Sequence, residues 1–135
     1  MTYTMQRVLI VDDEAMFRMT YITCLKQVEG ISVVGEAIDG WQATLLCDEL
    51  QPDVVIMDLI MPEMNGIEAA RLIRASCPQI KIILLTAAPL NTQLRDHALD
   101  AGATFCVNKP LHCDILRQMV WPYPTARVWT TSRLN

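Results

Sequence analysis

Five residues with complementary chemistry each close or closely follow an apolar run of the sequence: Asp12, Asp13, Asp58, Thr86 and Lys109. Clustered carboxylates repel one another, by on the order of 4 kcal/mol for two unit charges about 4 Å apart at an effective dielectric of about 20. A hard divalent cation, Mg²⁺ or Mn²⁺, would offset that repulsion using one or two carboxylates beside a phosphate. The Lys109 ammonium and the Thr86 hydroxyl can donate hydrogen bonds to phosphoryl oxygens. Asp58 could then act as a carboxylate nucleophile toward phosphorus, forming an aspartyl phosphate.

Taken singly, each of these residues has an ordinary structural explanation. Asp12 or Asp13 could cap the helix that follows, and Asp58 could be a turn residue. Thr86 could simply end a strand, and Lys109 could be a solvated surface charge. These separate explanations do not account for five such residues at the ends of predicted strands. We therefore predict a functional site at the edge where those strands end.

The elements that would position these side chains alternate between strands and helices. Apolar runs predict strands at residues 8–11, 31–37, 54–58, 82–86 and 104–107. Apolar residues at spacings of three and four predict a helix after each strand, the second capped by Asp39 and the fifth covering residues 111–120. The first, third and fourth strands are continuously apolar, as expected for strands covered on both faces, while the second and fifth fit the edges.

This alternation predicts an α/β fold of the flavodoxin-like, doubly wound type, with five βα units. The parallel sheet would have the order 2-1-3-4-5, and ligands would bind outside the carboxyl ends of its strands. One domain would cover residues 1–120, with a C-terminal tail over residues 121–135. The tail has some strand character at residues 125–131, and it is too short for a second domain.

Composition excludes several classes of protein. The chain has 135 residues and a net charge of −4, with a pI near 5.0, so we expect no direct binding of nucleic acid. No apolar run approaches the roughly 20 residues of a membrane helix. The first residues lack the pattern of a signal peptide, and we expect a cytoplasmic protein.

The cysteines number five, an odd count with no Cys-x-x-Cys pair. Neither a disulfide framework nor a zinc site fits this pattern, and we expect reduced cysteines packed as small apolar residues. His97 and His112 lie in predicted helical regions without ligand-like partners nearby. We expect structural or surface roles for both histidines.

From about residue 7 to residue 120 the chain resembles the response-regulator receiver domain of bacterial two-component signalling. The motifs that carry the resemblance are VLIVDDE at residues 8–14, DVVIMDLIMPEMNG at 53–66, TA at 86–87 and NKP at 108–110. VGEA at 34–37 and NGIEA at 65–69 are similar to the subgroup whose receivers usually precede a DNA-binding helix-turn-helix domain. The chain after residue 120 is too short for such a domain, so a stand-alone receiver and a fragment of a longer regulator are both open.

The resemblance implies a role for each residue of the predicted site. Asp58 would accept a phosphoryl group from the phosphohistidine of a sensor histidine kinase or a phosphotransfer protein. Asp13 would bind Mg²⁺ directly, Asp12 would help through water, and the backbone carbonyl of Ile60 would complete the metal site. Lys109 would pair with the phosphoryl group. The protein would catalyse only its own phosphorylation and slow dephosphorylation, and would not otherwise be an enzyme.

The resemblance also implies a conformational switch. Thr86 would move toward the phosphoryl oxygen and Phe105 would turn inward behind it, although an aromatic on a short strand is more often simply part of a core. The bond between Lys109 and Pro110 would be cis. The fourth helix, fifth strand and fifth helix would form the readout surface and a homodimer interface. Because neither Ile60 nor Ala88 can orient an attacking water, we expect a long-lived phosphorylated state.

Three other functions share parts of this pattern. A flavodoxin-like FMN carrier has the same strand order, but its phosphate site needs a neutral loop where this chain has Asp12 and Asp13. A hydrolase using Asp58 as nucleophile would need a second general acid that the sequence does not offer. A pseudo-receiver that only binds partners is the main alternative, and the complete set of acids, hydroxyl and lysine argues against it.

Overall fold

The structure of the protein, a computed structural model, describes residues 5–121. Five strands and five helices alternate along these residues: β1 (Gln6–Val11), α1 (Ala15–Lys26), β2 (Ile31–Ala37), α2 (Gly40–Leu50), β3 (Val54–Asp58), α3 (Gly66–Ser76), β4 (Lys81–Thr86), α4 (Thr92–Asp100), β5 (Phe105–Asn108) and α5 (Cys113–Val120). The strands are parallel and lie in the order β2-β1-β3-β4-β5. The predicted flavodoxin-like fold and strand order are confirmed.

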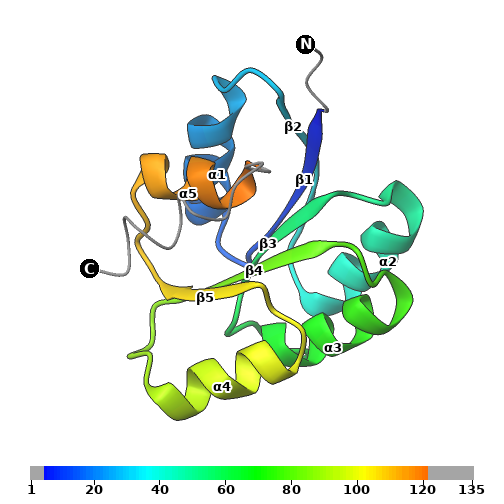
Figure 1. The fold of residues 1–135 in the computed structure, drawn as a ribbon, viewed down its shortest axis with the longest axis vertical. Coiled ribbons are helices and arrows are strands. Elements are labelled where there is room, and N and C mark those ends of the chain that lie inside the picture. Colours follow the sequence, from blue (N-terminus) through cyan, green and yellow to red (C-terminus); the bar gives the residue numbers. More distant parts are fainter. Residues whose placement is uncertain (1–4, 122–135) are drawn as a thin grey trace.

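Helices cover both faces of the sheet. Figure 1 shows α1 and α5 together on one face, and α2, α3 and α4 on the other. Successive side chains of a strand point to opposite faces, so the central strands supply two separate cores. Leu9, Val55 and Leu84 pack toward α2, α3 and α4, whereas Ile10, Ile56 and Leu85 pack toward α1 and α5. This double covering explains the unbroken apolar runs at residues 8–11 of β1, 54–57 of β3 and 82–85 of β4.

Local capping interactions fix the starts of several helices. The Asp39 side chain accepts a hydrogen bond from the Gln42 backbone N–H, which confirms Asp39 as the N-cap of α2. Asn65 and Glu68 form a reciprocal capping box at the start of α3. His112 is the N-cap of α5, where its Nδ1 accepts from the Asp114 N–H. The helix therefore begins at Cys113, two residues later than predicted.

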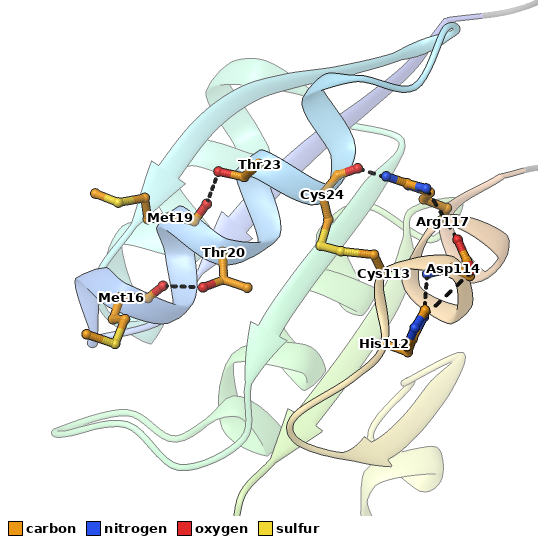
Figure 2. The surroundings of a disulfide bond; sticks show 9 residues. All are labelled: Met16, Met19, Thr20, Thr23, Cys24, His112, Cys113, Asp114 and Arg117. Atoms are coloured by element: carbon orange, nitrogen blue, oxygen red, sulfur yellow. Dashed lines mark hydrogen bonds and ion pairs between the residues drawn. A yellow bond between two sulfur atoms is a disulfide. The ribbon is translucent and has the colours of Figure 1, made fainter.

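A disulfide between Cys24 and Cys113 links α1 to the first turn of α5 (Figure 2). The prediction that all cysteines are reduced is wrong for this pair. Their 89-residue separation in sequence gives no local signal, and the packing of α1 against α5 brings their Cα atoms to 5.4 Å, within the usual range for a disulfide. Cys47, Cys77 and Cys106 are free and buried, as predicted.

Two expectations concern membranes and the C-terminal tail. None of the helices in residues 5–121 has the length and apolar character needed to cross a membrane. Almost all of the tail, including the segment 125–131 for which the sequence suggested strand character, lies outside the described residues.

Candidate functional site

The carboxyl ends of four parallel strands bring the five predicted residues to one edge of the sheet. Asp12 and Asp13 follow β1, Asp58 is the last residue of β3, Thr86 is the last residue of β4, and Lys109 directly follows β5. Carboxylate oxygens of the three aspartates lie within 4.8 Å of one another. The sequence pattern thus corresponds to a real acidic cluster built from segments distant along the chain.

Lys109 holds the centre of this cluster. Its Nζ lies 2.8 Å from Asp12 Oδ2 and 3.3 Å from Asp58 Oδ2, and only 2% of its side chain is exposed. The same Nζ lies 3.8 Å from the centroid of the Phe17 ring, where a cation is attracted by the negative face of the aromatic ring. The Lys109 backbone N–H donates to the Thr86 carbonyl at 2.8 Å, and the following bond to Pro110 is cis. The ammonium is therefore fixed between two buried carboxylates.

Asp12 and Asp13 differ in burial: the Asp12 carboxylate is buried and hydrogen-bonded, whereas Asp13 is exposed. Asp12 is 1% exposed. Its Oδ1 accepts from the Glu14 N–H at 2.9 Å and its Oδ2 from Lys109. The Arg18 guanidinium also binds the Asp12 backbone carbonyl at 2.8 Å. Asp13 is exposed, so its carboxylate can reach a ligand from solvent.

Burial makes the ionised form of Asp58 unfavourable. Asp58 is 6% exposed, and burial raises the pKa of its carboxyl above the ordinary value, with a further rise from Asp12. Lys109 and the Ile60 N–H, which donates to Asp58 Oδ1 at 3.3 Å, lower the pKa without reversing the rise. An additional cation beside Asp58 would therefore stabilise the carboxylate.

Thr86 and Phe105 occupy different depths near the site. Thr86 is fully buried, and its Oγ1 accepts from the Ala88 N–H at 3.1 Å. Phe105 pairs with Ile83 in the sheet register and is half-buried against the core beneath α1 and α5. Asn108, whose role the sequence did not suggest, donates to the carbonyls of Thr86 and Ala88. These bonds join the loop after β4 to the end of β5.

Two aromatic residues of α1, Phe17 and Tyr21, belong to the apolar spacing that predicted this helix, and the sequence suggested no further role for them. Phe17 and Tyr21 have ring centroids 6.1 Å apart and continue from Asp13 at spacings of four. Within the described residues the Tyr21 hydroxyl is buried without a hydrogen-bond partner, and burial, with Asp12 and Asp58, raises its pKa. The spacing of four residues from Asp13 to Phe17 and again to Tyr21 is the sequence signal that could have placed both aromatic rings beside the site.

The donor set fits a hard divalent cation. Mg²⁺ and Mn²⁺ prefer oxygen ligands, and the cluster offers carboxylates from Asp12, Asp13 and Asp58. Three carboxylates and the Lys109 ammonium leave two negative charges in excess, which one divalent cation would balance. The exposed Asp13 leaves an approach from solvent.

The family model of the response regulator receiver domain matches residues 8–121. VraR, a response regulator from Staphylococcus aureus, is 41% identical over 96 residues, which cover 71% of this chain and 46% of VraR. A Myxococcus xanthus protein-glutamate methylesterase/protein-glutamine glutaminase is 39% identical over 104 residues, covering 77% of this chain and 30% of that enzyme. A solved CheX–CheY–BeF₃⁻–Mg²⁺ complex from Borrelia burgdorferi contains a chain with 28% identity and a TM-score of 0.76, covering 92% of this chain and 89% of that one.

The chain therefore belongs to the response-regulator receiver family of two-component systems. It spans less than half the length of the two curated relatives described here. One of these relatives is named as a methylesterase and the other as a response regulator, yet both match most of this chain. Membership thus defines a signalling module and leaves its output to be proposed.

Proposed function

We propose that this chain is a phosphorylation-dependent switch in which Asp58 accepts a phosphoryl group in a Mg²⁺-dependent reaction. The observation that carries the proposal is the placement of Lys109 between the buried carboxylates of Asp12 and Asp58. If Lys109 only formed a structural ion pair, one carboxylate would be enough to balance its charge. Two buried carboxylates around one ammonium, with a third exposed beside them, favour a site that gathers positive charge for phosphoryl transfer.

The reaction would use the side chains in separate roles. A carboxylate oxygen of Asp58 attacks phosphorus, the bond from phosphorus to the donor's histidine nitrogen breaks, and the imidazole leaves with that electron pair. The Lys109 ammonium and the Thr86 hydroxyl hold phosphoryl oxygens. Asp12, Asp13, Asp58 and the Ile60 backbone carbonyl would hold Mg²⁺, or Mn²⁺ in its place, which supplies charge neutralisation when bound.

The signal would pass through the β4–β5 side of the sheet. Thr86 and Phe105 would form the two-state element, and the α4-β5-α5 face would carry the change to a partner or a homodimer interface. The donor would be a sensor histidine kinase or phosphotransfer protein in the cytoplasm. We assign the receiver to residues 1–120 and propose no direct contact with nucleic acid or membrane. A helix-turn-helix output would belong to a longer form of the protein.

Incubation with Mg²⁺ and acetyl phosphate, followed by intact-mass measurement, tests the proposal. We expect one phosphoryl adduct on the wild type, none on Asp58→Ala, and none when Mg²⁺ is chelated. Asp53→Ala is the matched control, because Asp53 lies at the opposite end of β3 and binds the Arg7 backbone N–H. Absence of an adduct with acetyl phosphate and with a phosphorylated histidine donor would instead favour a pseudo-receiver. A flavin absorbance band in the purified protein would favour the FMN carrier.

A further inference from the structure

The five cysteines fall into two chemically different groups. Cys47, Cys77 and Cys106 are free and enclosed in the core, and burial raises the pKa of Cys47 to about 12 and also raises that of Cys106. The Cys47 and Cys106 thiols are therefore poor nucleophiles, because little thiolate forms. Cys24 and Cys113 instead join two helices and line a surface groove of about 470 Å³. Only this pair combines a bonded partner with access from solvent among the described residues.

Access to this disulfide is greater at Cys113. Cys24 is 4% exposed, whereas Cys113 is half-buried at the start of α5. The groove beside them is also lined by Met19, Thr23 and Gln27 of α1 and by Arg117 of α5. Figure 2 shows Met16 and Met19 extending away from α1, with the disulfide crossing from that helix to α5. A small thiol entering the groove can therefore reach Cys113 Sγ first.

The disulfide belongs to the contact surface between α1 and α5, which we call the α1–α5 seam. Arg117 Nε donates to the Cys24 backbone carbonyl at 3.0 Å across this seam, as Figure 2 shows. Leu116, Met119 and Val120 of α5 are buried in the same core as Tyr21 and Leu25 of α1. The covalent bond thus reinforces a seam that already has apolar packing and a hydrogen bond, and α5 can stay folded onto the sheet without it.

The seam is directly continuous with the candidate site. Lys109 lies four residues before Cys113, and both are held by α1: the Lys109 ammonium against the Phe17 ring, and Cys113 by its bond to Cys24. The segment 109–113 is therefore attached to one helix at both ends. A movement that separates the start of α5 from α1 must therefore stretch or break the Cys24–Cys113 bond.

We propose that Cys24 and Cys113 form a reversible thiol–disulfide couple that restrains α5 against α1 when oxidised, and that phosphorylation at Asp58 shifts this couple toward the reduced form. The second half rests on the proposed function, because it requires phosphorylation to move the α4-β5-α5 face. By thermodynamic reciprocity, a disulfide that opposes this movement is itself disfavoured once the movement has occurred. Disulfides in reducing compartments are usually transient and redox-sensing, which agrees with a reversible couple.

The exchange balances with a low-molecular-weight thiol such as glutathione. One thiolate attacks Cys113 Sγ, the Cys24–Cys113 bond breaks, and Cys24 leaves with the electron pair and takes up a proton. A second glutathione thiolate attacks the glutathione sulfur of the mixed disulfide and releases Cys113 as a thiol. The protein disulfide is reduced by two electrons, and two glutathione molecules are oxidised to one glutathione disulfide.

The test equilibrates the full chain in buffers of graded reduced-to-oxidised glutathione ratio, with and without Mg²⁺ and acetyl phosphate. Acid quenching, alkylation in denaturant and mass spectrometry then report phosphorylation and the state of each cysteine in the same sample. We expect Cys24 and Cys113 to titrate together while the other cysteines stay alkylatable. We expect phosphorylation to shift the equilibrium toward dithiol by about fivefold or more, at the lower end of ordinary coupling between sites.

Asp58→Ala and Cys106→Ala are the controls. Asp58→Ala should retain the redox titration and lose its response to acetyl phosphate, while Cys106→Ala should retain both. A pair that stays oxidised or stays reduced over the whole glutathione range overturns the reversible couple. A phosphorylated protein with an unshifted titration overturns the coupling. Absence of phosphorylation both by acetyl phosphate and by a phosphorylated histidine donor refutes the proposed function and the coupling with it, while the titration still decides whether the couple is reversible.

Discussion

The acidic site and the α1–α5 seam lie next to each other and are stabilised in opposite ways. The site concentrates buried charge, with Asp12 and Asp58 both bound to one ammonium, and burial of Asp58 works against its ionised form. The seam concentrates apolar packing and a covalent bond, with Leu116, Met119 and Val120 buried beside Cys24. The first region is thus electrostatically costly, and the stability of the second region can offset that cost.

The segment 109–113 is where the two regions meet. At one end Lys109 is held by charges that a phosphoryl group or metal ion would rearrange. At the other end Cys113 is held by a bond that changes only with redox state. In the unphosphorylated protein, changes of charge should act mainly on the site and changes of redox state mainly on the seam, whereas phosphorylation of Asp58 is proposed to act on both. The following predictions test that division.

Replacing Lys109 with Met should have the largest effect on stability. The variant leaves two buried carboxylates without their shared cation, and removing one partner of a buried ion pair costs about 3–5 kcal/mol. Urea unfolding in metal-free buffer measures the loss. Lys26→Met, an exposed position in the last turn of α1, should change stability by less than about 0.5 kcal/mol. Equal stability of the two variants would mean that the site does not depend on Lys109 for its balance of charge.

Reducing the disulfide should cost about 2–4 kcal/mol, the typical effect of such a bond, because the disulfide restricts the unfolded chain across a separation of 89 residues. The free energy of unfolding of the wild type, measured with and without a strong reductant, gives this value. The double variant Cys24→Ser/Cys113→Ser should resemble the reduced wild type and should not respond to reductant. If reductant does not change the free energy of unfolding of the wild type, the seam is stabilised by its noncovalent packing alone.

The two regions also differ in how well the sequence predicts them. Asp58 ends its strand, and Asp12 directly follows another, so the positions of both residues follow from the positions of apolar runs. The fold itself followed from the same runs, because burial on both faces makes β1, β3 and β4 continuously apolar. β5 lies one residue later than predicted at both ends: the Thr104 hydroxyl accepts a hydrogen bond from the Ile82 N–H just before the strand starts, and Asn108 pairs with Thr86 where it ends.

The seam could not be predicted in this way. Cys24 and Cys113 meet only because two helices distant in sequence pack on the same face, and neither cysteine belongs to a recognisable spacing. The contact between Phe17 and Lys109 has the same origin. Local pattern therefore predicts which residues end a strand, whereas side-chain contacts between helices and loops require the packed structure.

Binding of Mg²⁺ should stabilise the folded protein by about 2.7 kcal/mol when the ion is present at 100 times its dissociation constant. Thermal unfolding across a Mg²⁺ titration measures this effect. Asp13→Asn should lose most of the response because its exposed carboxylate is the member of the cluster least engaged with protein groups. Asp48→Asn, at an exposed position in the C-terminal half of α2, should respond to Mg²⁺ like the wild type. Equal responses of both variants would place the ion elsewhere.

Asp58→Asn should raise stability at neutral pH in metal-free buffer, by about 0.5–2 kcal/mol, the common size of a stabilising substitution. The pKa of Asp58 in the folded state is raised, mainly by burial, above its ordinary value of 3.8. The native state therefore binds a proton more readily than the unfolded state, and the cost of the ionised carboxylate is present above the folded-state pKa. Lowering the pH through that pKa toward 3.8 should therefore bring the free energy of unfolding of the wild type up to that of Asp58→Asn.

Urea unfolding of both proteins at a series of pH values measures this convergence. Asp96→Asn, at an exposed position on α4, is the control for removing a negative charge. A difference between Asp58→Asn and the wild type that stays constant with pH would show that packing, and not ionisation, distinguishes them. Reducing the Cys24–Cys113 bond should not change the pH at which the unfolding free energies of the two proteins converge, because the group that titrates is Asp58 in the site.

The smallest expected effect concerns the lifetime of the phosphoryl group. Ile60 is 55% exposed and lies two residues after Asp58, where its apolar side chain cannot orient a water for attack on phosphorus. An amide at this position can, so Ile60→Asn should shorten the lifetime on the order of threefold, a difference of less than about 1 kcal/mol in the barrier. Decay of the phosphorylated species, followed by intact mass after removal of acetyl phosphate, measures it.

Ile60→Val keeps the side chain apolar and should preserve the long lifetime. Each decay should be followed in the oxidised and in the reduced protein, because this separates the two regions. If the residue at position 60 sets the lifetime, the ratio between wild type and Ile60→Asn should be the same in both redox states. A ratio that disappears on reduction would mean that the Cys24–Cys113 bond, by holding the segment that carries Lys109, determines whether water can reach phosphorus. The site and the seam would then have to be treated as one unit.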